Sequence, residues 1–398
     1  IEVKMIKKRR LFFKITFYSL FIIVFNSCAT VIYKSIPLKN IAKTKGTYFV
    51  GTQNFQVVDS SRVMWFTDNI KGPRKLSVKI WYPADNVDSF SKAPYINQHK
   101  IIGSFISKIF GVPEPLMDRA GGVKCNSWLN AVPARGKFPI VIYSHGHQSI
   151  KVANTSQAEE MASNGYIVIA FDHTYDAALT VIDNDNIIYT RSKLPQNDDE
   201  AASEKMIKRV KSQLKIRTDD ISFIIDKIEL KFSNDKSFSG IADFNNIGVF
   251  GHSFGGCTAI KSAYNDNRID AVLGLDAYFL PLSKDLIKKD LNKPFVHIGQ
   301  VDWGTSNNYN IMEEFGKNNS KSSYHFSVEG SKHNDFTDFS QFTKLTRKFG
   351  SGEISPKIIR NVMNDIMIGF FDAHLKDGEY FDAGKYEDTF KSVKTYVH

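Results

Sequence analysis

The segment Gly251–Gly255 reads G-H-S-F-G, the spacing of a serine nucleophile held in a sharp turn. It follows the apolar run Ile247–Phe250 and precedes the helix-compatible run Gly256–Tyr264. Such a turn between a strand and a helix is strained, and glycine on each side of the serine removes the Cβ atoms that would collide there. The pattern alone is only moderately specific, but this context predicts that Ser253 is a catalytic nucleophile.

A serine hydroxyl becomes a nucleophile when an imidazole takes its proton and a carboxylate holds that imidazole in the right tautomer. Asp276 directly follows the apolar run Ala271–Leu275, and His333 lies in the loop after the run Tyr324–Val328. Ser253 also follows an apolar run, so all three side chains can meet at the carboxyl edge of one parallel sheet. We therefore expect His333 to be the general base and Asp276 to orient it.

Other residues of the same types compete for these two roles. Asp302, beyond the apolar run Phe295–Ile298, is the alternative acid. We interpret His252 as the variable residue of the serine turn. His297 and His325 lie within strand-like runs, where histidines with satisfied hydrogen bonds are the usual explanation.

Ester cleavage through a serine also needs two backbone N–H groups aimed at the developing oxyanion. The N–H of Phe254, at the start of the helix after the serine, is one candidate. The second is the N–H of His147, because the segment Tyr143–His147 follows a predicted strand and contains a glycine that permits close approach. His145 and His147 could instead bind a metal ion, but we find no third ligand at a convincing spacing and no H-E-x-x-H motif.

The elements that must position these residues alternate along the chain. Short runs rich in apolar residues predict strands at Leu76–Tyr82, Pro139–Tyr143, Tyr166–Phe171, Ile247–Phe250, Ala271–Leu275, Phe295–Ile298 and Tyr324–Val328. Helices are predicted at Thr155–Asn164, Gly256–Tyr264, Ile311–Asn318 and Pro356–His374. This alternation predicts an α/β protein with a mostly parallel central sheet flanked by helices, and the serine turn makes it an α/β-hydrolase fold.

Residues 176–244 interrupt this alternation with a polar stretch followed by a charged, helical one. Apolar residues recur there at helical spacing, from Ile207 through Leu214 and Ile221 to Ile228. We expect a helical insertion near the active face. It is either a lid over the active site or an ordinary amphipathic helix packed on the sheet.

The N-terminus has the pattern of an export signal. Basic residues at Lys7–Arg10 precede the apolar stretch Leu11–Phe25, and small Ser27 precedes Cys28. Cys28 stands where the signal of a bacterial lipoprotein would be cut, so it is a candidate for lipidation. The alternative is an uncleaved membrane helix from about residue 11 to residue 33, close to the ~20 residues that span a bilayer.

These patterns divide the chain into three parts. We expect a lipoprotein signal or membrane anchor over residues 1–28, a tether over 29–46 and a catalytic domain over 47–398. The protein is then exported and held at a membrane surface, either in the periplasm or at the cell surface.

The formal net charge of +10 does not indicate nucleic-acid binding, because about half of it comes from residues 1–28 and the rest is spread thinly. Of the three cysteines, Cys125 and Cys257 are too few for a disulfide framework, and we expect Cys257 to be free and buried. No cofactor and no metal ion are predicted, and the sequence leaves protein partners and oligomeric state open.

The chain resembles the platelet-activating factor acetylhydrolases of the plasma and intracellular type II kind. The resemblance runs in order through most of the chain, at Gly51-Thr52 with Arg62, Ile80–Pro83, Phe138–Gly146, Ala162–Tyr166, Phe171–His173, Gly251–Gly256, Gly274–Ala277 and the H-x-x-F-x-D of His333–Asp338. It places the family's triad on Ser253, Asp276 and His333, and its oxyanion donors on Phe254 and His147. The family usually has an apolar residue at the position of His147. We expect His147 to make the pocket more polar, while its backbone N–H remains a donor.

The resemblance implies calcium-independent hydrolysis of the sn-2 ester of glycerophospholipids that carry an acetyl or another short or oxidised acyl chain. The residues themselves support only ester hydrolysis, since fold and triad do not fix the substrate. A general carboxylesterase, polyesterase or dienelactone-type hydrolase is the alternative with the same chemistry. Alternatives of other classes are an inactive lipid-binding surface lipoprotein and a metal-dependent hydrolase that uses His145 and His147.

Overall fold

The computed structural model describes residues 38–67, 70–110, 114, 118–183, 186–195, 203–303, 307–376, 378 and 380–398. The predicted signal or anchor over residues 1–28, Cys28 with it, lies outside the described residues. Among the helices that are described, none combines the length and the apolar character that a bilayer crossing requires.

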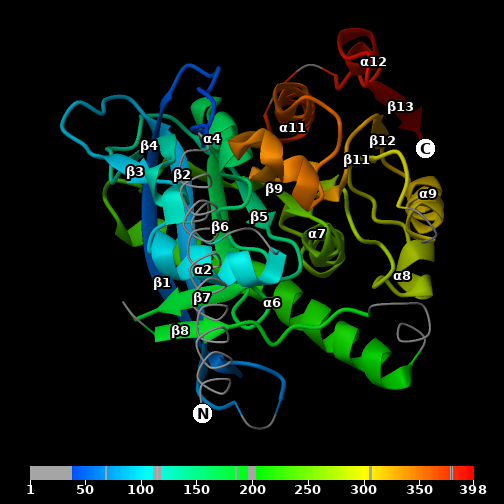
Figure 1. Ribbon diagram of the computed structural model, residues 1–398, viewed down its shortest axis with the longest axis horizontal. Coiled ribbons are helices and arrows are strands. Elements are labelled where there is room, and N and C mark those ends of the chain that lie inside the picture. The colour runs from blue at the N-terminus through cyan, green and yellow to red at the C-terminus, as the bar shows by residue number, and fades with distance from the viewer. Residues whose placement is uncertain are drawn as a thin grey trace, which may run out of the picture.

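The described residues form one eleven-stranded sheet with the strand order β13-β12-β11-β10-β9-β5-β6-β2-β1-β4-β3 (Figure 1). Six neighbouring strands in it are parallel. They are β5 (Phe138–Ser144), β6 (Ile167–Asp172), β9 (Ala242–His252), β10 (Ile269–Leu275), β11 (Phe295–Gln300) and β12 (Ser323–Val328). Each lies on a run that its apolar residues predicted, and nearly all their residues are buried, as strands covered on both faces must be.

The remaining strands extend the sheet at both ends. β2 (Pro73–Ala84) was predicted in part and pairs antiparallel with β6 and with β1 (Phe49–Val63). β1 was not predicted, because exposed or half-buried residues alternate along most of it and it has no continuous apolar run. The other unpredicted strands are short: β3 (Lys92–Pro94), β4 (Lys124–Leu129), β13 (Val393–Val397) and the separate hairpin of β7 (Leu179–Ile182) and β8 (Asn186–Tyr189).

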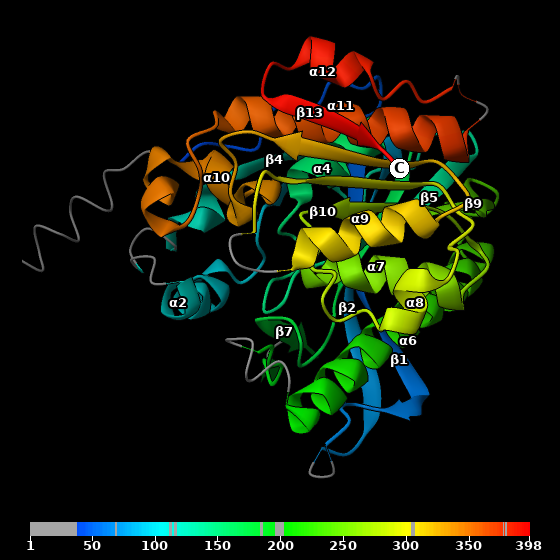
Figure 2. The same ribbon diagram turned by 90° about the vertical axis from the view of Figure 1, so that its right-hand side faces the viewer.

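Helices cover both faces of the sheet (Figure 2). The apolar cluster on one face includes residues of α6 (Glu204–Asn234), α7 (Phe254–Asn265), α8 (Lys284–Lys288) and α9 (Asn308–Asn318). The cluster on the other face includes residues of α4 (Thr155–Ser163) and α11 (Pro356–Leu375). Tyr386 of the short helix α12 (Lys385–Thr389) joins this second cluster, whereas α2 (His99–Phe110) and α10 (Phe339–Phe342) contribute to neither. The predicted architecture, a mostly parallel sheet flanked by helices, is confirmed.

The long helix of the predicted insertion, α6, packs into the core. Its apolar residues, among them Leu214, Ile221 and Ile228, are buried in the cluster between α6, α7 and the sheet. Ser203 caps its N-terminus by accepting a hydrogen bond from the N–H of Met206. These contacts are those of an amphipathic helix packed on the sheet, and a lid role for residues 176–244 stays a prediction.

The described end of the predicted tether, residues 38–46, lies against the domain. Ile41 is buried, and its N–H donates to the carbonyl of Lys124. The N–H of Lys39 donates to the carbonyl of Phe342 in α10. At this end the chain is therefore part of the fold rather than a free linker.

Both described cysteines, Cys125 and Cys257, are buried and unpaired. The prediction for Cys257 is confirmed. It packs in the cluster between α7 and the sheet as a small apolar side chain.

Candidate active site

Ser253 occupies a strained turn between β9 and α7. Its φ of 55° and ψ of −121° lie in a region that side-chain-bearing residues rarely adopt. A Cβ atom at Gly251 would lie 2.2 Å from the carbonyl carbon of Gly255, and one at Gly255 would lie 1.9 Å from the carbonyl oxygen of Ser144. The two glycines of the motif are therefore required for the turn to close.

Asp276 lies directly beside Ser253 because the two residues follow strands β10 and β9, which are in register. Leu275 of β10 pairs with His252 of β9 on one side and with Ile298 of β11 on the other. The N–H of Ser253 donates to the carbonyl of Leu275 at 3.0 Å. The two side chains thus leave neighbouring strands at the same edge of the sheet.

His333 joins them from the loop after β12. Its Nδ1 forms a 2.6 Å hydrogen bond with Oδ2 of Asp276. Asp302, the competing acid, is exposed, and the carboxylate that contacts the imidazole is that of Asp276. His333 and Ser253 line the same pocket, so the structure brings together the three residues that the sequence singled out.

Asp276 is fully buried and accepts several further hydrogen bonds. The Tyr309 hydroxyl donates at 2.6 Å, the Trp303 indole N–H at 3.1 Å, and both the backbone and side-chain amides of Gln300 at 3.1 Å. Burial alone would raise the pKa of this carboxyl group, but the hydrogen bonds from His333 and Tyr309 outweigh it and hold the pKa well below its ordinary value. Asp276 is therefore ionised at neutral pH and can stabilise a protonated imidazole.

None of the three supporting side chains around Asp276 was predicted. Tyr309 lies at the start of α9, and Trp303 and Gln300 follow β11. The sequence gives no signal for Tyr309, whose place depends on how α9 returns over the sheet. Trp303 does not line the pocket at Ser253.

His252 has a larger role than the variable position of the turn that we expected. Its Nε2 donates to the backbone carbonyl of His333 at 3.0 Å, and the two rings lie 4.5 Å apart. Burial, with a contribution from His333, lowers the pKa of His252 to about 3, so the ring is neutral and keeps this donor. His252 thus holds the loop that carries the expected general base.

His297, expected to be a core histidine, also supports the site. Its Nε2 accepts the N–H of Ala277, the residue after Asp276, at 3.0 Å. Burial lowers the pKa of His297 to about 4, which keeps the ring neutral and able to accept. His325, the other histidine expected in the core, is buried beside it with 4.9 Å between ring centroids.

The pocket at Ser253 has a volume of about 230 Å³. Its wall is largely apolar and includes three phenylalanines of one segment, Phe339, Phe342 and Phe349. Leu38, at the described start of the chain, completes the wall together with Ile96, Ile150 and Ala153. Bulky residues of the wall therefore come both from the segment after His333 and from Tyr95, Ile96 and Ile150, and neither Tyr278 nor Phe279 lines the pocket.

Of the two expected oxyanion donors, His147 lines this pocket and Phe254 directly follows Ser253 in the chain. Phe254 is the first residue of α7, where helix N–H groups have no partner within the helix. His147 lines the pocket in the loop after β5. A Cβ atom at the adjacent Gly146 would lie 3.4 Å from the Cβ of Ser253, so this loop passes close to the serine.

His145 is engaged in the fold through both ring nitrogens. Its Nδ1 donates to the carbonyl of Gly146 at 2.7 Å, and its Nε2 accepts the N–H of His173 at 3.0 Å. No group of three potential metal ligands occurs among the described residues. His145 therefore stabilises the loop after β5 that carries His147.

Arg217 of α6 also bonds to the loop after β5. Its role was not predicted from the sequence. The side chain is fully buried and bonds to the carbonyl of His145, to Oγ of Ser144 at 3.1 Å and to the carboxylate of Asp176. Its guanidinium lies 4.9 Å from the centre of the Phe254 ring. A signal was present, since Arg217 falls on the apolar stripe of α6 between Leu214 and Ile221.

The fold and these side chains define the class of the protein. A parallel sheet with helices on both faces, and a serine in a sharp turn after a central strand, are the features of an α/β-hydrolase. The model of the family described as platelet-activating factor acetylhydrolase, isoform II, matches residues 33–392. The chain belongs to this family and is a carboxylic ester hydrolase.

Individual relatives agree with this assignment at low identity. The platelet-activating factor acetylhydrolase of Canis lupus familiaris is 24% identical over 384 residues, which cover 88% of this chain and 81% of the relative. A probable 1-alkyl-2-acetylglycerophosphocholine esterase of Arthroderma benhamiae is 26% identical over 220 residues, 51% of this chain and 49% of the relative. The solved ferulic acid esterase of Streptomyces cinnamoneus superposes with a TM-score of 0.69 and 25% identity, covering 85% of this chain and 93% of that one.

Proposed function

We propose that this chain is a serine esterase that removes a short acyl group, acetyl above all, from the sn-2 position of a glycerophospholipid. The observation that carries the proposal is the ionised Asp276 bonded to His333 in the small apolar pocket that holds Ser253. Family membership supports the substrate class, because the relatives include platelet-activating factor acetylhydrolases of several vertebrates.

In this proposal Ser253 attacks the carbonyl carbon of the ester while Nε2 of His333 takes the hydroxyl proton. The Nδ1–H of His333 donates to Asp276, which stabilises the imidazolium. The N–H groups of Phe254 and His147 stabilise the oxyanion of the tetrahedral intermediate. The C–O bond then breaks, His333 returns the proton to the departing glycerol oxygen, and water hydrolyses the acyl-serine by the same steps.

The size of the pocket supports a short acyl group. At about 230 Å³ it is smaller than the ~300–1,000 Å³ typical of sites for drug-sized ligands. Phe339, Phe342 and Phe349 contribute to the wall that would stop a longer chain.

The test compares phospholipids that differ only in the sn-2 acyl group, from acetyl to palmitoyl, with the Ser253→Ala variant as the blank. We expect kcat/KM to fall steeply beyond a few carbons. Phe342→Ala should shift the preference towards longer chains, whereas Phe390→Ala, a truncation near the end of α12, should not. Equal rates on acetyl and palmitoyl esters, or no turnover of any phospholipid, would remove the acetylhydrolase proposal.

A general carboxylesterase is the second candidate, and the fold similarity to a ferulic acid esterase favours it. An enzyme of this kind would hydrolyse aryl esters and simple alkyl acetates at least as well as acetyl phospholipids. The same series, extended to methyl ferulate and ethyl acetate, separates the two candidates.

We also propose that the protein is exported and held at a membrane through its first 28 residues. The basic residues Lys7–Arg10, the apolar stretch after them and Cys28 support a lipoprotein signal, with an uncleaved helix as the alternative. Mass spectrometry of the mature N-terminus tests this: a lipid-bearing Cys28 as the first residue is expected. An intact peptide that continues upstream of Cys28 would exclude the lipoprotein.

A further inference from the structure

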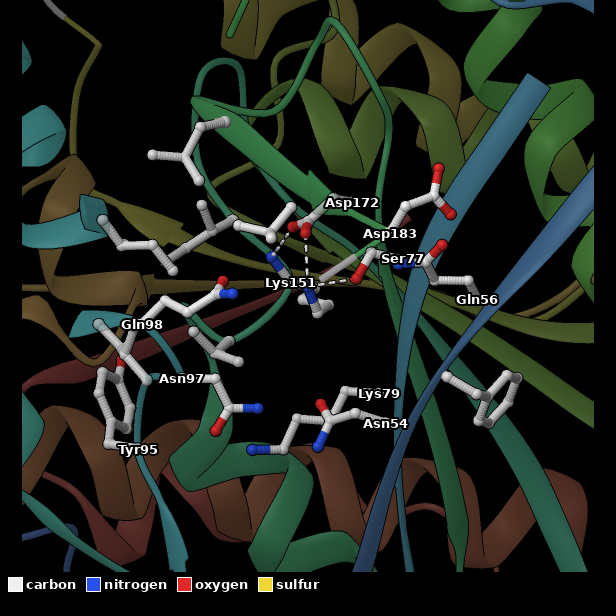
Figure 3. Close-up of a pocket in the computed structure, with 17 residues that line it drawn as sticks. Asn54, Gln56, Ser77, Lys79, Tyr95, Asn97, Gln98, Lys151, Asp172 and Asp183 are labelled. Carbon is white, nitrogen blue, oxygen red and sulfur yellow. Dashed lines mark hydrogen bonds and ion pairs between the residues drawn. The ribbon is translucent and has the colours of Figure 1, made fainter. Parts of the chain in front are cut away.

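A second, larger cavity of about 720 Å³ lies beside the pocket at Ser253 (Figure 3). Tyr95, Ile96 and Ile150 line both spaces, so the two are separated by one layer of side chains. The second cavity differs in chemistry because ammonium, carboxylate, hydroxyl and amide groups line much of it. Its volume lies within the range of ~300–1,000 Å³ that is usual for ligand sites.

The polar wall is built in rows across three strands. Gln56 of β1 pairs with Ser77 of β2, which pairs with Asp172 of β6. Two residues further along each strand, Asn54 of β1 pairs with Lys79 of β2. Residues 77 and 79 are two apart and so point to the same face of the sheet. The strands themselves therefore fix the spacing of these polar groups.

Most charges in the wall already have a partner. Nζ of Lys151 bonds to Asp172 at 2.5 Å and to Oγ of Ser77 at 3.1 Å. Asp183 bonds to Nζ of Lys75 at 2.6 Å. Each of these pairs is neutral as a whole, so neither supplies a net charge to the cavity.

Lys79 is the exception. Its exposed fraction is 3%, and within the described part of the chain it donates no hydrogen bond and forms no ion pair. Its Nζ lies 4.9 Å from the centre of the Trp81 ring. Figure 3 shows the side chain directed into the cavity near Asn54 and Asn97, away from Lys151 and Asp172.

The opposing charges near Lys79 do not neutralise it by contact. Glu159 is the carboxylate that favours its charged form, but the oxygens of Glu159 accept hydrogen bonds from Asn126 and Ser127. Burial lowers the pKa of Lys79, as expected for an ammonium without a counter-ion. A buried charge of this kind is costly unless a partner of opposite sign reaches it.

We propose that this cavity is a binding site for a singly charged oxyanion group of the ester substrate, with Lys79 as its counter-ion and the amides of Asn54 and Asn97 as further donors. One unneutralised ammonium matches one negative charge, which a phosphodiester or a carboxylate carries. Because the two spaces adjoin at Tyr95, Ile96 and Ile150, a substrate that reaches past these side chains would place its ester at Ser253 and its anion at Lys79. This inference deepens the proposed function and rests on it where the anion is assigned to the substrate.

Direct binding is measured first, by calorimetry on the Ser253→Ala protein at neutral pH. Dimethyl phosphate and butyrate are the anionic probes, and uncharged trimethyl phosphate is the control ligand. We expect saturable binding of at least one anion, weakened at least tenfold in Lys79→Met and retained in Lys137→Met, which removes an exposed lysine. Asn97→Leu, at the exposed rim, should weaken binding by a few fold and serves if Lys79→Met does not fold.

Kinetics on the active enzyme then distinguish the two sources of the anion. One substrate pair is a 1-alkyl-2-acetylglycerophosphocholine and the uncharged 1-alkyl-2-acetylglycerol. The other pair is the p-nitrophenyl esters of glutaric and butyric acid, which differ by a terminal carboxylate. In Lys79→Met we expect the ratio of kcat/KM for the charged substrate to that for the uncharged one to fall at least tenfold in one pair. A fall in the first pair would identify the anion as the headgroup, and a fall in the second would identify it as the acyl end.

Ratios that Lys79→Met and Asn97→Leu leave unchanged in both pairs overturn the inference, whether or not dimethyl phosphate binds. Failure of the proposed function would be a different result. In that case Ser253→Ala would retain ester hydrolysis, or no phospholipid would be turned over by the unmodified enzyme.

Discussion

Among the described residues, one set of serine, histidine and aspartate side chains lies at the pocket of Ser253 and a second set lies in the core. At the active-site candidate, His333 bonds to Asp276 at 2.6 Å and faces the pocket of Ser253 with a side-chain exposure of 35%. In the core, Oγ of Ser144 lies 3.0 Å from Nε2 of His173, and Nδ1 of His173 lies 2.9 Å from Asp220. All three residues of the core set are fully buried.

The two carboxylates differ in the charge of their hydrogen-bond partners. Asp220 bonds to Nε and Nη2 of the buried Arg74 at 2.5 and 2.6 Å, so a permanent cation already neutralises it. Asp276 receives only neutral donors besides His333. Its charge is therefore available to an imidazolium that forms during the reaction.

The electrostatics of the two histidines follow from these partners. Burial, with the nearby Arg217, lowers the pKa of His173 to about 4, so this ring resists taking a proton. The comparison teaches that hydrogen-bond geometry alone does not define a catalytic triad. Access to substrate and an unneutralised carboxylate are needed as well.

The largest expected difference between the two sets is in the serine. Ser253→Ala should lower kcat on a short-chain p-nitrophenyl ester by about 10⁴-fold or more, with little change in the thermal transition. Ser144→Ala should keep kcat/KM within tenfold but cost about 1–3 kcal/mol of stability, because Arg217 and His173 lose a buried partner. Steady-state kinetics and thermal unfolding on both variants check this, and a Ser253→Ala activity within a hundredfold of the unmodified enzyme would contradict the assignment of the nucleophile.

The aspartates should separate catalysis from stability in the same way. Asp276→Asn should lower kcat by about 10⁴-fold, since an amide favours the wrong tautomer of His333. Asp220→Asn should destabilise the fold by about 3–5 kcal/mol, because Arg74 keeps a buried charge without its counter-ion. Urea unfolding and kinetics at a temperature where both variants are folded provide the test. Equal losses of kcat in Asp276→Asn and Asp220→Asn would contradict the difference in role between the two aspartates.

Acid should lower the free energy of unfolding through His173 of the core set. His173 stays neutral in the folded state down to a pKa of about 4, whereas an unfolded histidine takes a proton near pH ~6.5. The unfolded state therefore binds more protons between these values, and stability falls by up to about 3 kcal/mol as the pH drops through this window. Urea unfolding between pH 7 and pH 4 measures it. A His173→Asn variant should show a shallower dependence, and an unchanged slope would contradict this origin.

The smallest expected effect concerns a single donor to Asp276. Tyr309→Phe removes one 2.6 Å hydrogen bond but leaves those of Trp303 and Gln300. Hydrogen bonds to charged groups contribute about 1.5–3 kcal/mol, and the remaining donors compensate in part, so kcat should fall by roughly tenfold. A loss as large as that of Asp276→Asn would mean that Tyr309 acts on the substrate itself.

The sequence predicted the parallel half of the sheet well, for a physical reason. Strands buried on both faces need continuous apolar runs, and β5, β9 and β10 have them. The residues after such strands must lie at one edge, which is why Ser253 and Asp276 could be singled out together. β1 could not be found in this way, because its residues alternate between environments and its pairing with β2 depends on distant contacts.

The supporting residues were out of reach for a different reason. Arg217 and Tyr309 act through partners far away in the chain, and no local pattern shows which partner a charged or hydroxyl side chain will meet. The three phenylalanines of the pocket were missed because the segment after His333 consists of helical turns too short to show a periodic apolar pattern. Its folding over Ser253 is decided by tertiary packing rather than by periodicity.

Leu38 gives the described start of the chain a place in the pocket wall. Nine residues separate it from Cys28, and the ten residue steps between the two reach at most ~35 Å when fully extended. A lipid attached to Cys28 would therefore keep the entrance to the esterase within one protein diameter of the bilayer. Amphiphilic esters could then be drawn from the lipid surface over a short path rather than captured from dilute solution.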